Sequence, residues 1–128
     1  MLLALRHPRL WLVTGWILIV LATVASIVPA HELPRIGGVS DKLEHVVGYL
    51  VLALWFAGIY PKARYPMIGV GLLVMGIVIE GLQGAMKVGR EADLRDVYAN
   101  SLGIVCGLLL ALAWLGGWAQ RVEAWTRR

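Results

Sequence analysis

The chain contains little charge and a single cysteine. Charged residues make up 16% of its 128 residues, whereas 59% are hydrophobic, and the mean hydropathy is +0.75. One cysteine, Cys106, excludes a disulfide framework within the chain and a metal site built from cysteines. Its small side chain lies among apolar residues, so we expect it in the protein interior. The scarcity of charge excludes a highly charged disordered chain and indicates an integral membrane protein.

Four apolar runs approach the length of a membrane-spanning helix. A bilayer core about 30 Å thick needs roughly 20 apolar residues per helix. The runs cover residues 10–28, 43–60, 67–82 and 97–119. The first is longer than the apolar core of a signal peptide, about 7–15 residues, and is expected to be an uncleaved span. The sequence therefore predicts an all-α fold: an integral membrane four-helix bundle that forms one domain over residues 1–128.

The distribution of basic residues predicts how the bundle is oriented. Seven basic residues and one acid flank the side that holds both termini, whereas the other side holds five basic residues and seven acids. Because short cytoplasmic loops are enriched in Lys and Arg, both termini are predicted inside and residues 29–42 and 85–95 outside. Aromatic residues fall near the same boundary, as in a membrane aromatic belt: Trp11, Trp55, Tyr60, Tyr65, Trp114 and Trp118.

The last residues predict a separate short helix. Trp118, Val122 and Trp125 recur at the spacing of one helical face. A short amphipathic helix with basic residues is typical of the interface of a membrane with anionic lipids. The alternative is a frayed continuation of the fourth span.

Polar residues cluster at the predicted outer ends of three spans. Asp93, Asp96 and Asn100 share one helical face, which Gly103 and Gly107 continue. Small residues let helices approach closely in a bilayer, and polar residues bond between them. The second, third and fourth spans are therefore predicted to converge on one polar pocket. The second and third spans supply Asp41, Lys42, His45 and Tyr49, and Gly69, Gly76, Glu80 and Gln83.

The order and spacing of these residues resemble those of the VanZ-like family. The pattern is Asp41-Lys42-x-x-His45-x-x-x-Tyr49, Glu80-x-x-Gln83, Arg90, and Asp93-x-x-Asp96-x-x-x-Asn100-x-x-Gly103-x-x-x-Gly107. The resemblance covers roughly residues 40–110. It implies a small bacterial membrane protein, and the member that names the family is associated with low-level resistance to glycopeptide antibiotics, notably teicoplanin. It does not imply a particular biochemical activity.

Two sets of site residues follow from this pocket. We expect His45, Glu80, Asp93 and Asp96 to supply acid–base chemistry. Substrate-binding candidates are Asp41, Lys42, Tyr49, Gln83, Arg90 and Asn100. Lys42 and Arg90 each lie near a predicted helix N-terminus, where a phosphate is favourably bound.

Each of these assignments has a simpler alternative. Asp41 and Asp93 are also suited to capping their helices, with an acid three residues later. His45 is equally suited to a hydrogen-bonded interior position. His45, Asp93 and Asp96 are plausible ligands for a divalent metal, but no HExxH motif supports that role. The sequence leaves metal and cofactor requirements unknown.

Three classes of function remain open. The first is an enzyme that acts on a lipid-linked cell-envelope precursor in the bacterial cytoplasmic membrane. The second is a non-catalytic protein that binds a lipid, a cell-wall precursor or a glycopeptide and alters access to it. The third, a proton-coupled carrier, is disfavoured by four short spans without an internal repeat. The expected partners are membrane lipids, and no nucleic acid is expected.

Overall fold

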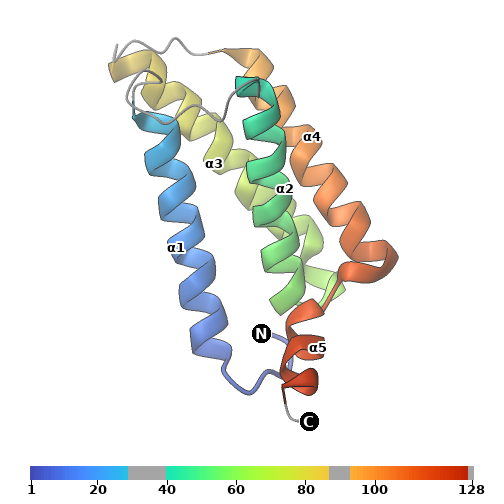
Figure 1. Ribbon diagram of the computed structural model, residues 1–128. Helices are drawn as coiled ribbons and strands as arrows, with labels where there is room; N and C mark the ends of the chain where they lie inside the picture. The colour runs from blue at the N-terminus through green and yellow to red at the C-terminus, as the bar shows by residue number, and fades with distance from the viewer. Residues whose placement is uncertain (29–39, 87–92, 127–128) are drawn as a thin grey trace.

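The computed structural model describes residues 1–28, 40–86 and 93–126, and these residues form helices and no strand. Four long helices run side by side, with the N- and C-termini near the same end (Figure 1). They are α1 (Pro8–Ile27), α2 (Asp41–Ile59), α3 (Tyr65–Met86) and α4 (Leu94–Leu110). The 3₁₀ turn Lys62–Arg64 leads into α3, the π-helical segment Ala111–Leu115 extends α4, and α5 (Trp118–Trp125) follows. The all-helical prediction is confirmed.

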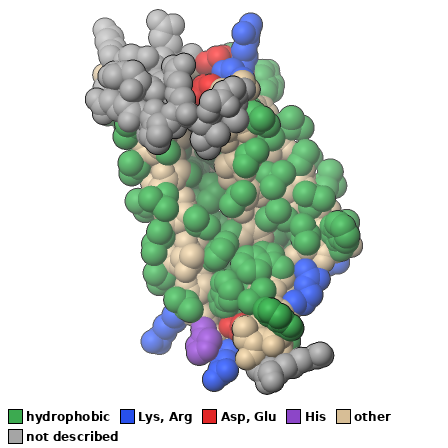
Figure 2. Space-filling model, in the orientation of Figure 1, with side chains coloured by type: hydrophobic (Ala, Val, Ile, Leu, Met, Phe, Trp, Pro, Cys, Tyr) green, Lys and Arg blue, Asp and Glu red, His purple; other side chains and the backbone are tan. Residues whose placement is uncertain are grey.

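The outer surface of the bundle is apolar, as a lipid-facing surface must be. Large side chains such as Trp16, Val70 and Leu109 are more than half exposed. Figure 2 shows hydrophobic side chains covering the length of the visible face, with Lys and Arg at both ends and the visible acids mostly at its upper end. Four helices are long and apolar enough to cross a membrane. The chain is therefore a multi-pass membrane protein, whose termini lie on the same side.

Small residues let α2 and α4 pack backbone to backbone. A Cβ atom added at Gly103 would overlap the Val46 carbonyl oxygen. One added at Gly107 would lie 2.8 Å from both the Leu50 carbonyl oxygen and the Ala53 Cβ. Close packing at the predicted glycine stripe is therefore confirmed. This contact brings the polar residues at the beginning of α4 against those at the beginning of α2.

The bounds of the third and fourth helices differ most from the sequence prediction. The third helix begins before residue 67 because a helix accepts proline in its first turn, where Pro66 lies. It also continues to Met86, so Glu80 lies inside the helix rather than in its last turn. The fourth span ends at Leu115 rather than at residue 119, because Gly117 adopts a left-handed conformation with φ of 66° and turns the chain.

The C-terminal helix is docked against the bundle through contacts of Trp118 and Glu123. The Trp118 indole covers Gly58 and donates to the Leu54 carbonyl oxygen at 2.9 Å. Glu123, 6% exposed, accepts hydrogen bonds from the backbone N–H groups of Arg6 and His7 and from the Trp11 indole. These hydrogen bonds hold the pKa of the Glu123 carboxyl below its usual range, and the bond from the Arg6 N–H has the largest effect.

The predicted aromatic belt is partly an internal cluster. The rings of Trp11, Trp55 and Trp118 contact one another, with centroids 5.1 to 5.7 Å apart. Trp118 was expected on the lipid-facing side of α5, but its contacts with α2 orient it inward. Val122 and Trp125 remain exposed on α5, and the position of this helix at a membrane interface stays a prediction.

Candidate functional site

Each of the two helices that meet at the site begins with a side-chain cap. Ser40 precedes α2, and its hydroxyl accepts from the Leu43 N–H at 3.3 Å. Asp93 precedes α4, and its carboxylate accepts from the Arg95 N–H at 2.9 Å. The capping alternative is thus confirmed for Asp93 and wrong for Asp41, because Ser40 occupies the cap and places Asp41 in the first turn.

Lys42 joins the beginnings of α2 and α4. Its ammonium group donates to Asp93 Oδ2 at 2.7 Å and to Asp96 Oδ1. The bond from Lys42, reinforced by the Arg95 N–H, holds the pKa of the Asp93 carboxyl below its usual range. Lys42 is therefore engaged by two carboxylates, and this pairing competes with its predicted role in binding phosphate.

His45 is held in one orientation by α4. Its Nδ1 lies 2.9 Å from the side-chain oxygen of Asn100, and its Nε2 lies 3.6 Å from Asp96 Oδ2. An amide oxygen only accepts hydrogen bonds, so Nδ1 carries the proton and donates it to Asn100. In the neutral imidazole, the Nε2 lone pair then faces the Asp96 carboxylate. All three side chains are buried.

Glu80 of α3 belongs to the same cluster. Its Oε2 accepts the backbone N–H of Asp93 at 3.0 Å, and its side chain lies close enough to Asp96 and His45 to interact electrostatically with both. Glu80 is 5% exposed and its Oε1 has no hydrogen-bond partner among the described residues. The Tyr49 hydroxyl, on a side chain 4% exposed, is likewise unpartnered within the described part of the chain.

Gln83 and Arg90 are the predicted site residues for which the described part of the structure shows no contact with this cluster. Gln83 is buried, and its Nε2 donates to the Ser26 carbonyl oxygen at 2.6 Å, which links α3 to α1. The sequence did not predict this contact. Arg90 lies outside the described residues. The structure thus brings together the following predicted residues at one end of the bundle: Lys42, His45, Glu80, Asp93, Asp96 and Asn100.

A cavity of about 160 Å³ adjoins this cluster between α1 and α2. Ala22, Ala25 and Ser26 of α1 form one wall. The wall from α2 includes Asp41, His45 and Tyr49. The contribution of α1 was not predicted, although the small residues 22, 25 and 26 share one helical face, which is typical of a close contact with a neighbouring helix. The structure therefore gives the polar cluster an adjoining space lined by both polar and apolar side chains.

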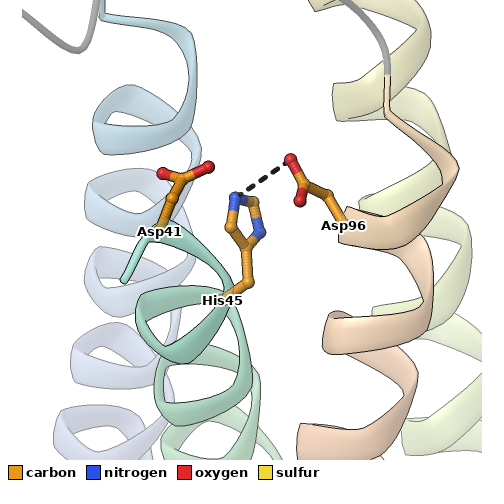
Figure 3. A group of neighbouring side chains, drawn as sticks. All are labelled: Asp41, His45 and Asp96. Carbon is orange, nitrogen blue, oxygen red and sulfur yellow. Dashed lines mark ion pairs between the residues drawn. The ribbon is translucent and has the colours of Figure 1, made fainter. Parts of the chain in front are cut away.

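Asp41, His45 and Asp96 also form a group with the composition of a metal site. One oxygen or nitrogen atom from each lies within 4.8 Å of the others. Figure 3 shows the imidazole between the two carboxylates, with Asp41 and His45 from α2 and Asp96 from α4. This set differs from the one suggested by sequence, because Asp93 caps α4 and pairs with Lys42 while Asp41 takes its place.

Comparison with known proteins adds no family to this description: no protein-family model, curated protein or solved structure matches the chain.

Proposed function

We propose that this chain is a protein of the bacterial cytoplasmic membrane, similar to the VanZ-like family, that binds or acts on a lipid-linked cell-envelope precursor. The single observation that carries this proposal is the buried polar cluster at one end of an apolar bundle. His45, Glu80 and Asp96 are each at most 9% exposed. Ionisable groups in a membrane span are costly to bury and are usually retained for function.

The charge of the two ends supports an outward-facing site. The end that holds the termini carries Arg6, Arg9, Lys62, Arg64 and Arg121. By the preference of basic residues for the cytoplasm, this end lies inside, and both termini are cytoplasmic. The cluster of Lys42, His45 and Asp96 then lies at the outer face, where lipid-linked precursors of the cell envelope are used.

The cavity beside the cluster suits the headgroup of a lipid. Its α1 wall is made of small side chains, and its α2 wall offers Asp41, His45 and the Tyr49 ring. In the enzymatic version of the proposal, the Nε2 lone pair of His45 accepts a proton, and the nearby Asp96 carboxylate stabilises the resulting charge.

The non-catalytic version is favoured by a separate observation. Lys42 is bound to Asp93 and Asp96, and His45 to Asn100, so several polar groups already satisfy one another across α2 and α4. Such pairs hold helix ends together. In this version they shape a pocket that binds a precursor, a lipid or a glycopeptide without chemistry. Low-level resistance to teicoplanin-type antibiotics would follow from either version.

Binding of a defined lipid tests the proposal. The full chain is reconstituted in nanodiscs, and its binding of a polyprenyl diphosphate is compared with that of phosphatidylglycerol. We expect preferential binding of the diphosphate lipid, weakened by Asp96→Asn and Lys42→Gln, because each change removes a charge from the polar cluster beside the cavity. Lys62→Gln is the matched control, since Lys62 is an exposed lysine at the other end. Equal binding of both lipids, or equal effects of the two lysine changes, would contradict the proposal.

A further inference from the structure

We propose that Asp41, His45 and Asp96 bind one divalent transition-metal ion of the zinc or manganese class. The donor set contains one imidazole and two carboxylates, which together suit ions between the purely oxygen-preferring and the thiolate-preferring metals. The site differs from one made by His45, Asp93 and Asp96, because the Asp93 carboxylate contacts Lys42 and the Arg95 N–H at the beginning of α4 instead.

The orientation of the imidazole is that of a metal ligand. Asn100 accepts the Nδ1 proton, and this leaves the Nε2 lone pair directed at Asp96 Oδ2. Histidine ligands commonly donate their second ring N–H to a carbonyl or carboxylate, which fixes the tautomer and the ring plane. Asn100, 2% exposed, is therefore the positioning residue for His45.

The spacing of the facing atoms fits an ion between them. Metal–ligand bonds of about 2.1 Å at a tetrahedral angle place two ligand atoms roughly 3.4 Å apart. The distance between His45 Nε2 and Asp96 Oδ2 is 3.6 Å, which is longer than a hydrogen bond and close to this value. Lys42 contacts the other oxygen of Asp96 and leaves Oδ2 available. Asp41, exposed on the first turn of α2, contributes a carboxylate oxygen within 4.8 Å of the ligand atoms of His45 and Asp96.

Two further atoms beside the group have no hydrogen-bond partner within the part of the chain that the structure describes. The Tyr49 hydroxyl belongs to a side chain that lines the same cavity as Asp41 and His45. Glu80 Oε1 belongs to a carboxylate that interacts electrostatically with His45 and Asp96. Buried polar atoms are normally satisfied, so unpaired atoms here indicate a bound species that this cluster accommodates, such as an ion with its water ligands.

The ion also resolves a conflict of charge. Acids outnumber bases among the described residues of this end, which carries Asp41, Glu44, Glu80, Asp93 and Asp96 against Lys42 and Arg95. Such a surface repels a phosphate, whereas a divalent cation attracts the carboxylates and the phosphate together. This role in lipid binding rests on the proposed function, but the ion site itself does not.

Metal analysis of the purified chain tests the ion site without any lipid. The full chain, with its affinity tag removed, is stripped with chelator and equilibrated with Zn²⁺ or Mn²⁺ alone, and bound metal is measured after dialysis. Wild type is expected to retain about one ion per chain. Asp41→Asn, His45→Gln and Asp96→Asn should each weaken binding at least about tenfold, since removal of even an indirect partner costs that much.

Glu44→Gln is the matched control, because it removes the same charge from an exposed acid in the first turn of α2. It should keep binding within about threefold of wild type. The site is refuted if wild type retains no ion, if Asp96→Asn or His45→Gln retains it fully, or if Glu44→Gln loses it while Asp41→Asn does not. Adding chelator to the polyprenyl diphosphate assay then separates the two proposals. If the chain binds the ion but chelator leaves lipid binding unchanged, the ion site stands and its role in lipid binding is refuted.

Discussion

The close contact of α2 and α4 makes Gly103→Ala the most informative single change in the bundle. The new Cβ would overlap the Val46 carbonyl oxygen and lie 3.0 Å from the Leu50 nitrogen. Both atoms belong to the backbone, so no side-chain rotation relieves the contact and the two helices must separate. Gly103 lies one turn from Asn100, and Val46 is adjacent to His45, so the separation also disturbs the polar cluster.

The expected loss of stability in Gly103→Ala follows from a comparison with other glycine substitutions in the same chain. Overpacking of a close contact costs about 1–3 kcal/mol. Replacing glycine by alanine in a helix gains up to about 1 kcal/mol from propensity. Gly81→Ala has the same gain and no steric cost, since nothing lies within 4 Å of its added Cβ. Gly103→Ala should therefore be less stable than Gly81→Ala by about 1–3 kcal/mol. Gly107→Ala, with contacts of 2.8 Å, should fall between them.

Reversible unfolding of the chain in mixed detergent micelles, followed by circular dichroism, measures these differences. The three variants differ only in the position of one methyl group, so the comparison cancels most effects of the detergent. A Gly103→Ala protein as stable as Gly81→Ala would refute the packing argument and the claim that α4 is held against α2 through its glycines.

Two other predictions concern the orientation of the bundle and the docking of α5. In a Cys106→Ala background, a cysteine at position 62 should be protected from a membrane-impermeant thiol reagent in intact cells and one at position 31 should be labelled, and the reverse result would invert the proposed orientation. Because its hydrogen bonds lower the pKa of Glu123, they stabilise the docked α5 above the usual glutamate pKa of 4.5, and this stabilisation is lost as pH falls through the lower folded value. Fluorescence of the adjacent Trp11–Trp118 cluster should report the release of α5 at low pH, and a Glu123→Gln protein with an unchanged pH profile would show that this carboxyl does not control docking.

Much of the fold could be predicted because a bilayer imposes a strict length and composition on a helix. The four spans and the glycine stripe of α4 follow from that constraint. Helix ends were less predictable: Pro66 is tolerated at the start of α3, and only the conformation of Gly117 decides that α5 turns away from α4. The docking of α5 through Glu123 depends on backbone N–H groups of residues 6 and 7, which a periodicity analysis does not consider.

The membership of the polar cluster was more predictable than its internal pairing. Helical spacing placed Asp96 and Asn100 on one face, and the structure directs both toward His45. Spacing could not predict that Lys42 would bind two carboxylates of α4, or that Ser40 rather than Asp41 would cap α2. Those choices depend on how α2 and α4 are aligned along their lengths, and small residues at their contact set that alignment.

The account depends most on whether the buried carboxylates act or merely join helices, and near-isosteric charge removal measures this directly. Asp96→Asn and Glu80→Gln are introduced into the chromosomal gene. Sensitivity to a teicoplanin-type glycopeptide and to envelope stress is then measured, and the abundance of each variant in the membrane is checked. Glu91→Gln is the control, since residue 91 lies off the helical face shared by Asp93, Asp96 and Asn100 in sequence. The account predicts normal abundance throughout, with loss of the wild-type phenotype in the first two variants and its retention in the control. Wild-type behaviour of Asp96→Asn and Glu80→Gln at normal abundance would contradict it.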